Sequence, residues 1–341
     1  MKITFICEKK NQFGGKEKYL SRLLKCFDKN EVPYSLINSP FKKFLPSWVK
    51  VFLFNLFVFS KKKDQFYFSL ERITCADIYR AGDGVHKFFF ENFNKSKLNP
   101  LHYINIFLEK KCFENSSHII ANSIMVKSQI TKIYNVNSDK ISVVYNGIDK
   151  NYCNPIEVKR IKDNLKIKGE KIFLFVGSGY KRKGAREFID IISKLKKNKI
   201  KGLIIGKEKK INFYKDYAKK NNVENNILFL GPVKDVTPYY VLSDFFILPT
   251  HYEPFSNVVL EAMLHGNAVF TTCQNGAHEI LKTEFIMTNP SDLAILDDIQ
   301  KILHNQKLLE EIKISNMKIA EKYSIENNFI QTLKIIRATN N

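Results

Sequence analysis

Two acidic residues, Glu253 and Glu261, lie eight positions apart in a stretch that runs from a polar loop into a helix. About two helical turns separate such positions, which would place both carboxylates on one side of a site at different heights. A pair of this kind can hold the two ends of one polar ligand. The spacing alone favours a plainer interpretation, in which a loop acid is followed by a solvated helix acid.

The segment that carries these acids, residues 244–272, predicts a strand, a loop, a helix and a second strand. The apolar run Phe245–Leu248 ends before a proline and has the length of a buried strand. Asn257 is the expected N-cap of the helix and Gly266 its expected end. Residues 268–272 follow as the next strand. Open α/β sheets bind ligands at the carboxyl ends of their strands, so the intervening loop is the expected site.

A second group with chemical potential is the basic run Lys181–Lys183, in the sequence FVGSGYKRKGAREF. An expected strand ends at Gly177, and a helix is expected to begin near Gly184. Cations beside the amino terminus of a helix suit a diphosphate in both charge and geometry. A solvated basic turn is the alternative, because the chain contains 55 lysines and arginines.

The amino-terminal half offers two weaker signals. Gly14 and Gly15 lie between an expected strand and a helix, where backbone amides can meet a phosphate or a sugar, although a tight turn explains them equally well. The turn DGVH places His86 within reach of Asp83, and such a pair can orient a hydroxyl group. The alternative there is a tight turn with a surface histidine.

The sequence EPFSNVVLEAMLHG resembles the Glu-x7-Glu signature of retaining family-4 glycosyltransferases. That family has the α/β fold called GT-B, with two Rossmann-like domains whose parallel sheets face a central cleft. The resemblance implies that Glu253 meets the donor sugar and Glu261 the ribose hydroxyls. It also implies that Arg182 and Lys183 neutralise the donor diphosphate. Ser256 stands where the family usually has glycine.

Other segments resemble the same family: FGG, RAGDGVH of its lipopolysaccharide-core branch, VVYNGID before the domain linker, and QNGAHEIL. The resemblance implies an acceptor domain over 1–148, a nucleotide-sugar domain over 149–320, and a helix over 321–341 that crosses back. The implied catalytic residues are Glu253, Arg182, Lys183, Asp83 and His86. The implied donor contacts are Gly14, Gly15, Gly177, Ser178, Phe255, Ser256, Asn257 and Glu261.

The implied activity is transfer of a hexose, with anomeric retention, from a UDP-sugar to a lipopolysaccharide- or lipooligosaccharide-core-type acceptor. No Asp-x-Asp occurs in the chain, so we expect no metal and no cofactor beyond the UDP-sugar co-substrate. Two other functions stay open. A UDP-sugar epimerase of the same fold would consume the donor without an acceptor, and a polyanion- or nucleic-acid-binding protein would use the net charge of +21.

This charge predicts attraction to anions, but no recognisable nucleic-acid-binding module is present, so no specific nucleic acid is expected. The expected partners are a lipid-linked or phosphorylated saccharide and an anionic membrane surface. No run reaches the roughly 18 apolar residues of a membrane-spanning helix. The six cysteines lack a C-x-x-C pair and indicate reduced thiols in a cytoplasmic protein.

Residues 41–63 are strongly apolar between 49 and 59 and carry lysines at both ends. An apolar helix with basic residues at both ends is typical of an interfacial membrane anchor. A buried helix packed on the amino-terminal sheet explains the same pattern, and both can hold in part. The first interpretation predicts a peripheral protein at the cytoplasmic face of the inner membrane.

Overall fold

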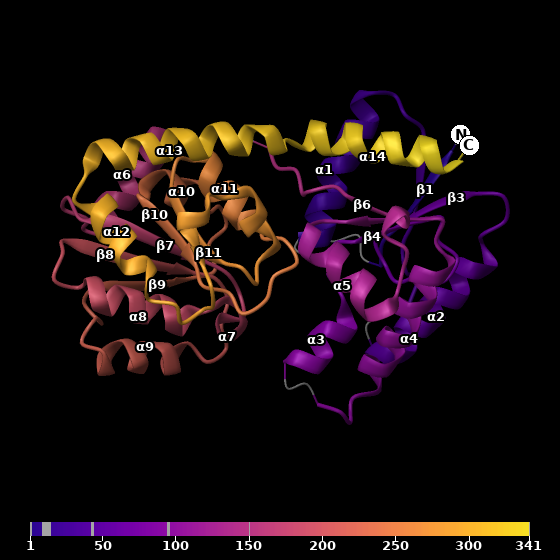
Figure 1. Cartoon of the computed structure of the whole chain (residues 1–341), viewed down its shortest axis with the longest axis horizontal. Coiled ribbons are helices and arrows are strands. Elements are labelled where there is room, and N and C mark those ends of the chain that lie inside the picture. Colours follow the sequence, from indigo (N-terminus) through magenta and orange to yellow (C-terminus); the bar gives the residue numbers. More distant parts are fainter. Residues whose placement is uncertain (1, 9–14, 42–43, 94–95, 150, 341) are drawn as a thin grey trace. The chain divides into compact units, whose positions relative to one another are not determined.

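The computed structural model describes residues 2–8, 15–41, 44–93, 96–149 and 151–340. The chain forms two compact units, one of residues 1–147 with 325–341 and the other of residues 148–324 (Figure 1). The first boundary lies one residue before the expected one. The second lies at 325, where α14 begins, instead of at 321. Gly14 of the expected glycine loop lies outside the described residues.

The first unit is built on a parallel six-stranded sheet with the strand order β2-β1-β3-β4-β5-β6. Right-handed crossovers through helices are what parallel neighbours require, and the chain supplies a helix between most of them. The strands are β1 Ile3–Ile6, β2 Tyr34–Ile37, β3 Phe66–Ser69, β4 Ile78–Ala81, β5 His118–Ala121 and β6 Ile141–Val143. The helices are α1 Gly15–Lys29, α2 Ser47–Ser60, α3 His86–Asn92, α4 Pro100–Asn115, α5 Ile124–Tyr134 and α14 Ile325–Asn340.

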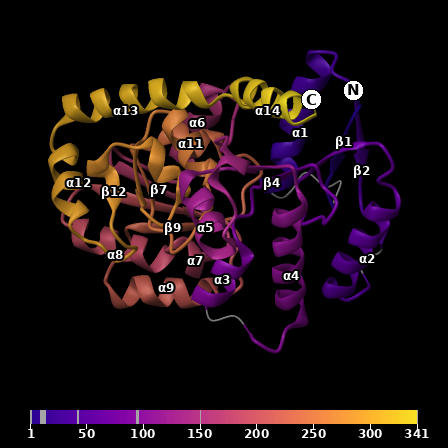
Figure 2. The same ribbon diagram turned by 45° about the vertical axis from the view of Figure 1, so that its right-hand side comes forward.

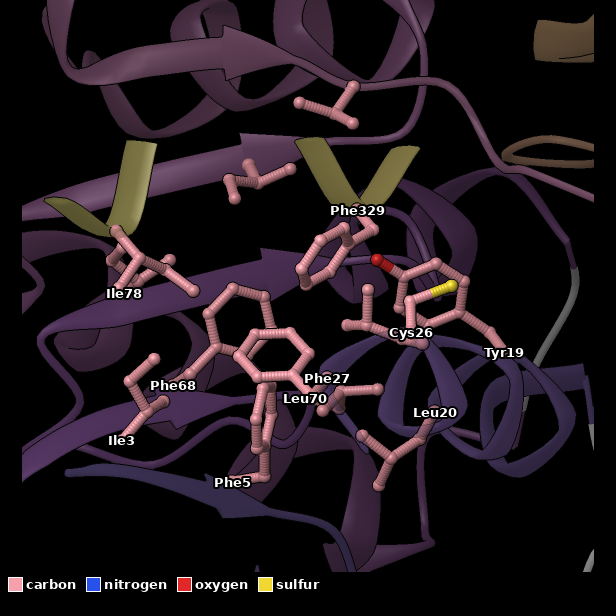
Figure 3. Close-up of a cluster of buried hydrophobic side chains, with 14 of the residues drawn as sticks. Ile3, Phe5, Tyr19, Leu20, Cys26, Phe27, Phe68, Leu70, Ile78 and Phe329 are labelled. Atoms are coloured by element: carbon pink, nitrogen blue, oxygen red, sulfur yellow. The ribbon is translucent and has the colours of Figure 1, made fainter. Parts of the chain in front are cut away.

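The core of the first unit joins the two ends of the chain. Phe27 of α1 packs edge-on against Phe5 of β1 and Phe329 of α14, with ring centroids 5.1 and 5.0 Å away (Figure 3). A buried hydrogen bond of 2.9 Å runs from the Tyr19 hydroxyl to the Asn328 side chain. The last helix is therefore an integral part of the first unit.

The second unit repeats this architecture with a parallel sheet of order β12-β11-β10-β7-β8-β9. The strands are β7 Lys171–Val176, β8 Ile200–Ile205, β9 Ile227–Gly231, β10 Phe245–Leu248, β11 Ala268–Thr272 and β12 Ile286–Met287. The helices are α6 Pro155–Asn164, α7 Tyr180–Lys183, α8 Ala185–Leu195, α9 Ile211–Lys220, α10 Thr237–Leu242, α11 Asn257–Leu264, α12 Ile295–Leu303 and α13 Gln306–Ala320. The expected pair of Rossmann-like α/β units with parallel sheets is confirmed, and β12 is a strand that the sequence did not predict.

Gly184 shows how closely the segments at the carboxyl end of this second sheet approach one another. Its φ of +82° favours glycine, and a Cβ atom there would lie 1.8 Å from the carbonyl oxygen of Pro249. Only glycine lets the start of α8 pass this close to the end of β10. The turn α7 is thereby held beside the loop that follows β10.

Helix α2 has two different apolar faces, one buried and one exposed, so the interpretation of residues 41–63 as a buried helix is confirmed for one face. Phe54 and Val58 are buried, and the buried Asn55 side chain donates to the carbonyl of Arg72 (2.7 Å) and accepts from the amide of Thr74 (3.0 Å). The opposite face carries exposed apolar side chains, at Trp48, Phe52, Leu56 and Phe59. Among the described residues, no helix is long and apolar enough to span a membrane.

Candidate active site

The second unit brings the expected acid and both expected cations into one cluster. The Glu253 carboxylate lies in the loop after β10, is 17% exposed, and forms ion pairs with Arg182 and with the Lys183 ammonium at 2.6 Å. Arg182 also donates to the carbonyl oxygen of Tyr252 at 2.8 Å. Two cations therefore share a single carboxylate, which leaves one positive charge in excess.

Burial and charge act in opposite directions on this cluster. Burial alone would raise the pKa of Glu253, but Lys183 and Arg182 hold it below its usual value. Burial lowers the pKa of Lys183, and the neighbouring Arg182 lowers it further, against the attraction of Glu253. A second anion beside Arg182 and Lys183 would stabilise the charged forms of both side chains, because it would supply the negative charge that the cluster lacks.

The basic residues lie on the short helix α7, which the sequence analysis expected to be a loop. The carbonyl oxygen of Arg182 accepts hydrogen bonds from the amide of His251 (2.9 Å) and from the Thr250 hydroxyl (3.0 Å). Gly177 makes room for the Lys183 stem, since a Cβ atom at this glycine would lie 3.0 Å from the Lys183 Cγ. The turn is thus fixed to the ends of both β7 and β10.

The start of α11 differs from the prediction in its cap. Ser256, not Asn257, is the N-cap residue, and its side chain makes no capping hydrogen bond. The helix ends before Gly266, whose φ of +74° fits the expected glycine stop. Two adjacent polar residues compete for one cap position, and the backbone angles at 256 decide between them.

Asn275, which follows β11, fixes this helix start from the neighbouring strand. Its fully buried side chain accepts from the amides of Ser256 (3.2 Å) and Ala277 (3.1 Å) and donates to the Thr271 hydroxyl (3.0 Å). The backbone of Glu253 pairs with the same segment, because its carbonyl accepts from the Gly276 amide at 2.9 Å. Asn275 thus holds the loop that carries Glu253.

Glu261 lies in the middle of α11, where it accepts a hydrogen bond of 3.1 Å from the Tyr240 hydroxyl. Burial and this carboxylate raise the pKa of Tyr240 well above its usual value, so the phenol stays protonated and continues to donate. The Tyr240 ring stacks on His265 with 14° between the planes. Glu261 is therefore held by a neutral donor, whereas Glu253 is held by cations.

The remaining donor contacts expected in the second unit also lie at the carboxyl end of its sheet. Ser178 is exposed, and its hydroxyl accepts a hydrogen bond of 3.1 Å from the Lys207 amide. Phe255 is buried in the loop before α11. The run 207–210 includes Glu208, which accepts from the Tyr180 amide at 2.9 Å and so helps to fix the start of α7.

The first unit holds the two other expected catalytic residues with different partners, Asp83 beside Lys16 and His86 beside His102. The Lys16 ammonium contacts the carboxylates of Glu71 (2.8 Å) and Asp83 (3.0 Å). Burial, together with the Asp83 charge, raises the pKa of Glu71 despite its contact with Lys16. Lys16 directly follows Gly15, so the glycine loop ends beside this cluster.

His86 begins α3 and stacks on His102 of α4, with a ring-nitrogen contact of 3.0 Å between His86 Nε2 and His102 Nδ1. The amides of His86 and Lys87 donate to the carboxylate of Glu109, at 2.7 and 3.2 Å. Glu109 is fully buried and also pairs with Arg72 at 2.9 Å. Glu109 was not predicted as a site residue, and Asn275 was expected to offer only its backbone amide to the donor, because the side-chain partners of both residues are far apart in the sequence.

Two family models match the chain. Residues 66–152 match glycosyltransferase family 4, and residues 157–318 match glycosyl transferases group 1. An uncharacterized glycosyltransferase of Methanocaldococcus jannaschii is 29% identical over 242 residues, which is 65% of this chain and 60% of that protein. The chain spans less than two thirds of the length of such curated relatives.

Two solved structures show the same fold over nearly the whole chain. The crystal structure of WaaG, a glycosyltransferase involved in lipopolysaccharide biosynthesis, has a TM-score of 0.81 and 18% identity, and the match covers 98% of this chain and 99% of that one. HepE of Anabaena, in complex with UDP and glucose, has a TM-score of 0.76 and 16% identity, and the match covers 99% and 100%. The expected GT-B fold is thereby confirmed.

Proposed function

The chain belongs to the glycosyltransferases, with a family 4 domain followed by a group 1 domain, and on this premise we propose that it transfers a hexose from a UDP-sugar with anomeric retention. The acceptor in this proposal is a lipid-linked or phosphorylated saccharide of the lipopolysaccharide- or lipooligosaccharide-core type. The reaction takes place at the cytoplasmic face of the membrane. No metal ion takes part in it.

The observation that carries the proposal is the pairing of two cations with one carboxylate in the second unit. Arg182 and Lys183 are both within ion-pair distance of Glu253, so one positive charge is left for an anionic ligand. A nucleoside diphosphate supplies such an anion, and charge-assisted hydrogen bonds to phosphate are among the strongest in proteins. The HepE structure with UDP and glucose supports UDP as the nucleotide.

Each charged residue then has a separate role in the donor site. Arg182 and Lys183 stabilise the charge that develops on the leaving diphosphate, which is the electrostatic part of catalysis. Glu253 binds the transferred sugar and Glu261 the ribose hydroxyls. Within the second unit, the proposal assigns backbone and side-chain contacts around the donor to Gly177, Ser178, Phe255 and Asn257.

The acceptor side of the proposal rests on the first unit. Asp83 and His86 lie at the turn between β4 and α3, where a hydroxyl group can be oriented by a carboxylate and an imidazole. Phe90 of α3 packs on the ring of His102 (5.1 Å) and against Tyr103 (5.7 Å), and flat aromatic faces of this kind suit sugar rings. The WaaG match supports an acceptor related to lipopolysaccharide.

The membrane part of the proposal rests on the exposed face of α2. Helices α2 and α4 pack against each other within the first unit (Figure 2), and each exposes apolar side chains. Those of α4 are Tyr103 and Phe107, which are four positions apart. An apolar helix face beside Lys61 and Lys63 suits an anionic lipid surface, which attracts both the apolar area and the charge.

Vesicle co-sedimentation tests this membrane contact. We expect pelleting with anionic vesicles, less pelleting at high salt, and loss of pelleting in a Phe52→Ser, Leu56→Ser, Phe59→Ser variant. A variant with Lys42, Lys43, Lys61, Lys62 and Lys63 changed to Gln isolates the electrostatic part. Pelleting of both variants to the same extent as the parent would remove the membrane from the proposal.

The transfer reaction itself is tested by incubating the protein with a panel of UDP-sugars in the presence of EDTA and following the anomeric signals by NMR. The proposal predicts slow hydrolysis of one donor, release of the sugar as the donor's anomer, and faster turnover when a core-type acceptor is added. Conversion of the donor to another UDP-sugar without any acceptor would indicate an epimerase instead. Activity that requires added Mg²⁺ or Mn²⁺ would reject the metal-free scheme.

A further inference from the structure

A groove of about 630 Å³ lies between strand β6, at the edge of the first sheet, and helix α14. Binding sites for small molecules have volumes of this order. The groove opens to solvent, and all the residues that line it belong to the first unit. It is separate from the site of the proposed transfer, because none of its residues takes part in that reaction.

One wall of the groove is the face of the sheet that α14 covers. Ile120 of β5 and Val144, directly after β6, pack there in a buried cluster with Phe329 of α14. Successive side chains of a strand alternate between its two faces, so His118 lies on the same face as Ile120. The His118 ring contacts the Ser142 hydroxyl of β6 at 2.8 Å, which places a polar pair beside the apolar Val144.

The other wall is one flank of α14. Its residues recur at the helical spacing i, i+3, i+4 and i+7, so they form a single stripe along the helix. They are Gln331, Lys334, Ile335 and Ala338. Both walls therefore combine an apolar surface with polar groups, which suits a ligand that has a polar and an apolar part.

The polar groups of the groove include free donors and no acid. None of the ten residues that line it is acidic. The Lys334 ammonium forms no ion pair or hydrogen bond with the described residues. His118 uses Nε2 on Ser142, and its other ring nitrogen has no partner in the described part of the chain. When the Ser142 hydroxyl donates to Nε2, a neutral ring carries its proton on Nδ1 and can donate it to an anion.

Two lysines near His118 add positive charge. Lys127 donates to the carbonyl oxygen of Ile141 at 2.7 Å, and Lys140 donates to that of Phe113 at 2.8 Å. Burial lowers the pKa of His118, and the charges of Lys127 and Lys140 lower it further. An anion in the groove would offset this repulsion and raise the pKa of His118.

We propose that this groove binds a small phosphate monoester. Lys334 and His118 contact the phosphate, which carries a charge of about −1.5 to −2 at pH 7 and several strong acceptor oxygens. The apolar part of the ester packs on Val144 and Ile335. The site is additional to the proposed glycosyl transfer and does not rest on it.

NMR of the His118 ring during a titration with n-butyl phosphate tests the proposal, because this signal reports on the groove and not on the second unit. We expect a saturable shift of the signal and a rise in the pKa of His118. Inorganic phosphate, which lacks the apolar part, should bind about tenfold more weakly. Pentanoate, which keeps the four-carbon chain but has a carboxylate, should also bind about tenfold more weakly.

Lys334→Gln is the test variant, and it should weaken butyl phosphate binding by about tenfold. Arg337→Gln is the matched control, because Arg337 is an exposed cation of the same helix that does not line the groove. It should bind butyl phosphate within about twofold of the parent. An unchanged His118 signal, or equal losses of affinity in the two variants, would overturn the proposal.

Two further outcomes would overturn the class of ligand. Inorganic phosphate or pentanoate that binds as tightly as butyl phosphate would show that the groove does not select an apolar phosphate monoester. A soluble short-chain phosphatidic acid that binds more tightly than butyl phosphate would assign the groove to a lipid headgroup instead of a small ester. UDP enters none of these measurements, so the outcome is independent of the proposed transfer.

Discussion

The charged clusters of the two units differ in how their charges balance. In the second unit, Arg182 and Lys183 share the one carboxylate of Glu253. In the first unit, Lys16 contacts two carboxylates, those of Glu71 and Asp83. Lys183 therefore shares one carboxylate with Arg182, whereas Lys16 pairs with two carboxylates.

This difference indicates which unit can accept an anion. A cluster with more cations than acids gains energy from a diphosphate, whereas a cluster with more acids than cations loses energy when another negative charge approaches. A neutral, hydroxyl-rich acceptor avoids this repulsion and can donate hydrogen bonds to carboxylates. On the proposed function, this difference in pairing favours the second unit for the nucleotide and the first unit for the saccharide.

The largest effect on UDP binding is expected from substituting one of these lysines, Lys183, and the same substitution at Lys16 is the comparison. Lys183→Met removes the excess positive charge and should weaken UDP binding by more than about a hundredfold, as expected for the loss of a buried charge that contacts phosphate. Lys16→Met should leave UDP binding within about twofold of the parent, because its partners are carboxylates. Calorimetric titration of both variants with UDP measures the contrast.

Equal losses of UDP affinity in the two variants would break the comparison between the units. Thermal unfolding is the control here, since each substitution leaves a carboxylate with one cation fewer. A variant that is folded at the assay temperature gives a valid binding constant whatever its melting temperature.

The next largest effect separates the two acids of the central motif. Glu261→Ala should weaken UDP by about ten- to a hundredfold, because the ribose that it is proposed to bind is part of UDP. Glu253→Gln should leave UDP binding at least as tight as in the parent and lower the transfer rate by about a hundredfold. Turnover assays beside UDP titrations show whether the two variants differ in this way.

A smaller effect is expected at the stacked histidines of the first unit. His86→Ala should reduce transfer to the acceptor by about tenfold, the lower range for loss of a group that orients a hydroxyl. Donor hydrolysis and UDP binding should stay at the parent values, because the His86 ring contacts His102 and its backbone amide, which alanine keeps, donates to the Glu109 carboxylate. A loss of UDP affinity in this variant would show that the histidine belongs to the nucleotide side.

The smallest effect concerns stability against pH. Burial would raise the pKa of Glu253, but Lys183 and Arg182 hold it below its usual 4.5. Its ion pairs therefore stabilise the fold fully above that pH and less as the pH falls through the lowered pKa. Glu253→Gln should be less stable than the parent at about pH 7, and the gap should close in acid.

Glu71 should give the opposite sign, because burial raises its pKa above 4.5. Its carboxyl group binds a proton more readily in the folded state, so its contribution to stability is greatest below pH 4.5 and declines as the pH rises through the folded-state pKa. Melting temperatures of the parent, Glu253→Gln and Glu71→Gln between about pH 3 and 7 test both signs. If the melting-temperature difference between parent and variant changed with pH in the same direction for Glu253→Gln and Glu71→Gln, the charge comparison between the units would be contradicted.

The sequence was sufficient to predict most of the fold. Short apolar runs bounded by glycine or polar residues correspond to strands such as β10 Phe245–Leu248, and 3.6-residue spacing predicts helices such as α5 Ile124–Tyr134. β12 escaped prediction because two residues carry no periodic signal and pair only where β11 offers an edge. The two faces of α2 were also ambiguous, since a helix that is apolar all round does not show which side packs.

The residue types of the candidate site were predictable from the sequence, but the side-chain contacts between them were less so. Local motifs indicate Glu253, Arg182 and Lys183, yet the ion pairs join positions about 70 residues apart, as the Arg182–Glu253 separation of 71 shows. Asn275 gave no signal for its role, because a buried amide that fixes another loop looks like any turn asparagine. Such contacts follow from tertiary packing, which local patterns do not encode.

The most direct test of the nucleotide side is a titration of the parent with UDP and with uridine, in EDTA and at rising salt. We predict saturable binding of one UDP per chain without metal, at least about a hundredfold tighter than uridine, and still measurable at high salt because the cations are partly buried. UDP that binds no better than uridine, or that binds only when a divalent metal is added, would contradict the claim that Arg182 and Lys183 hold the diphosphate.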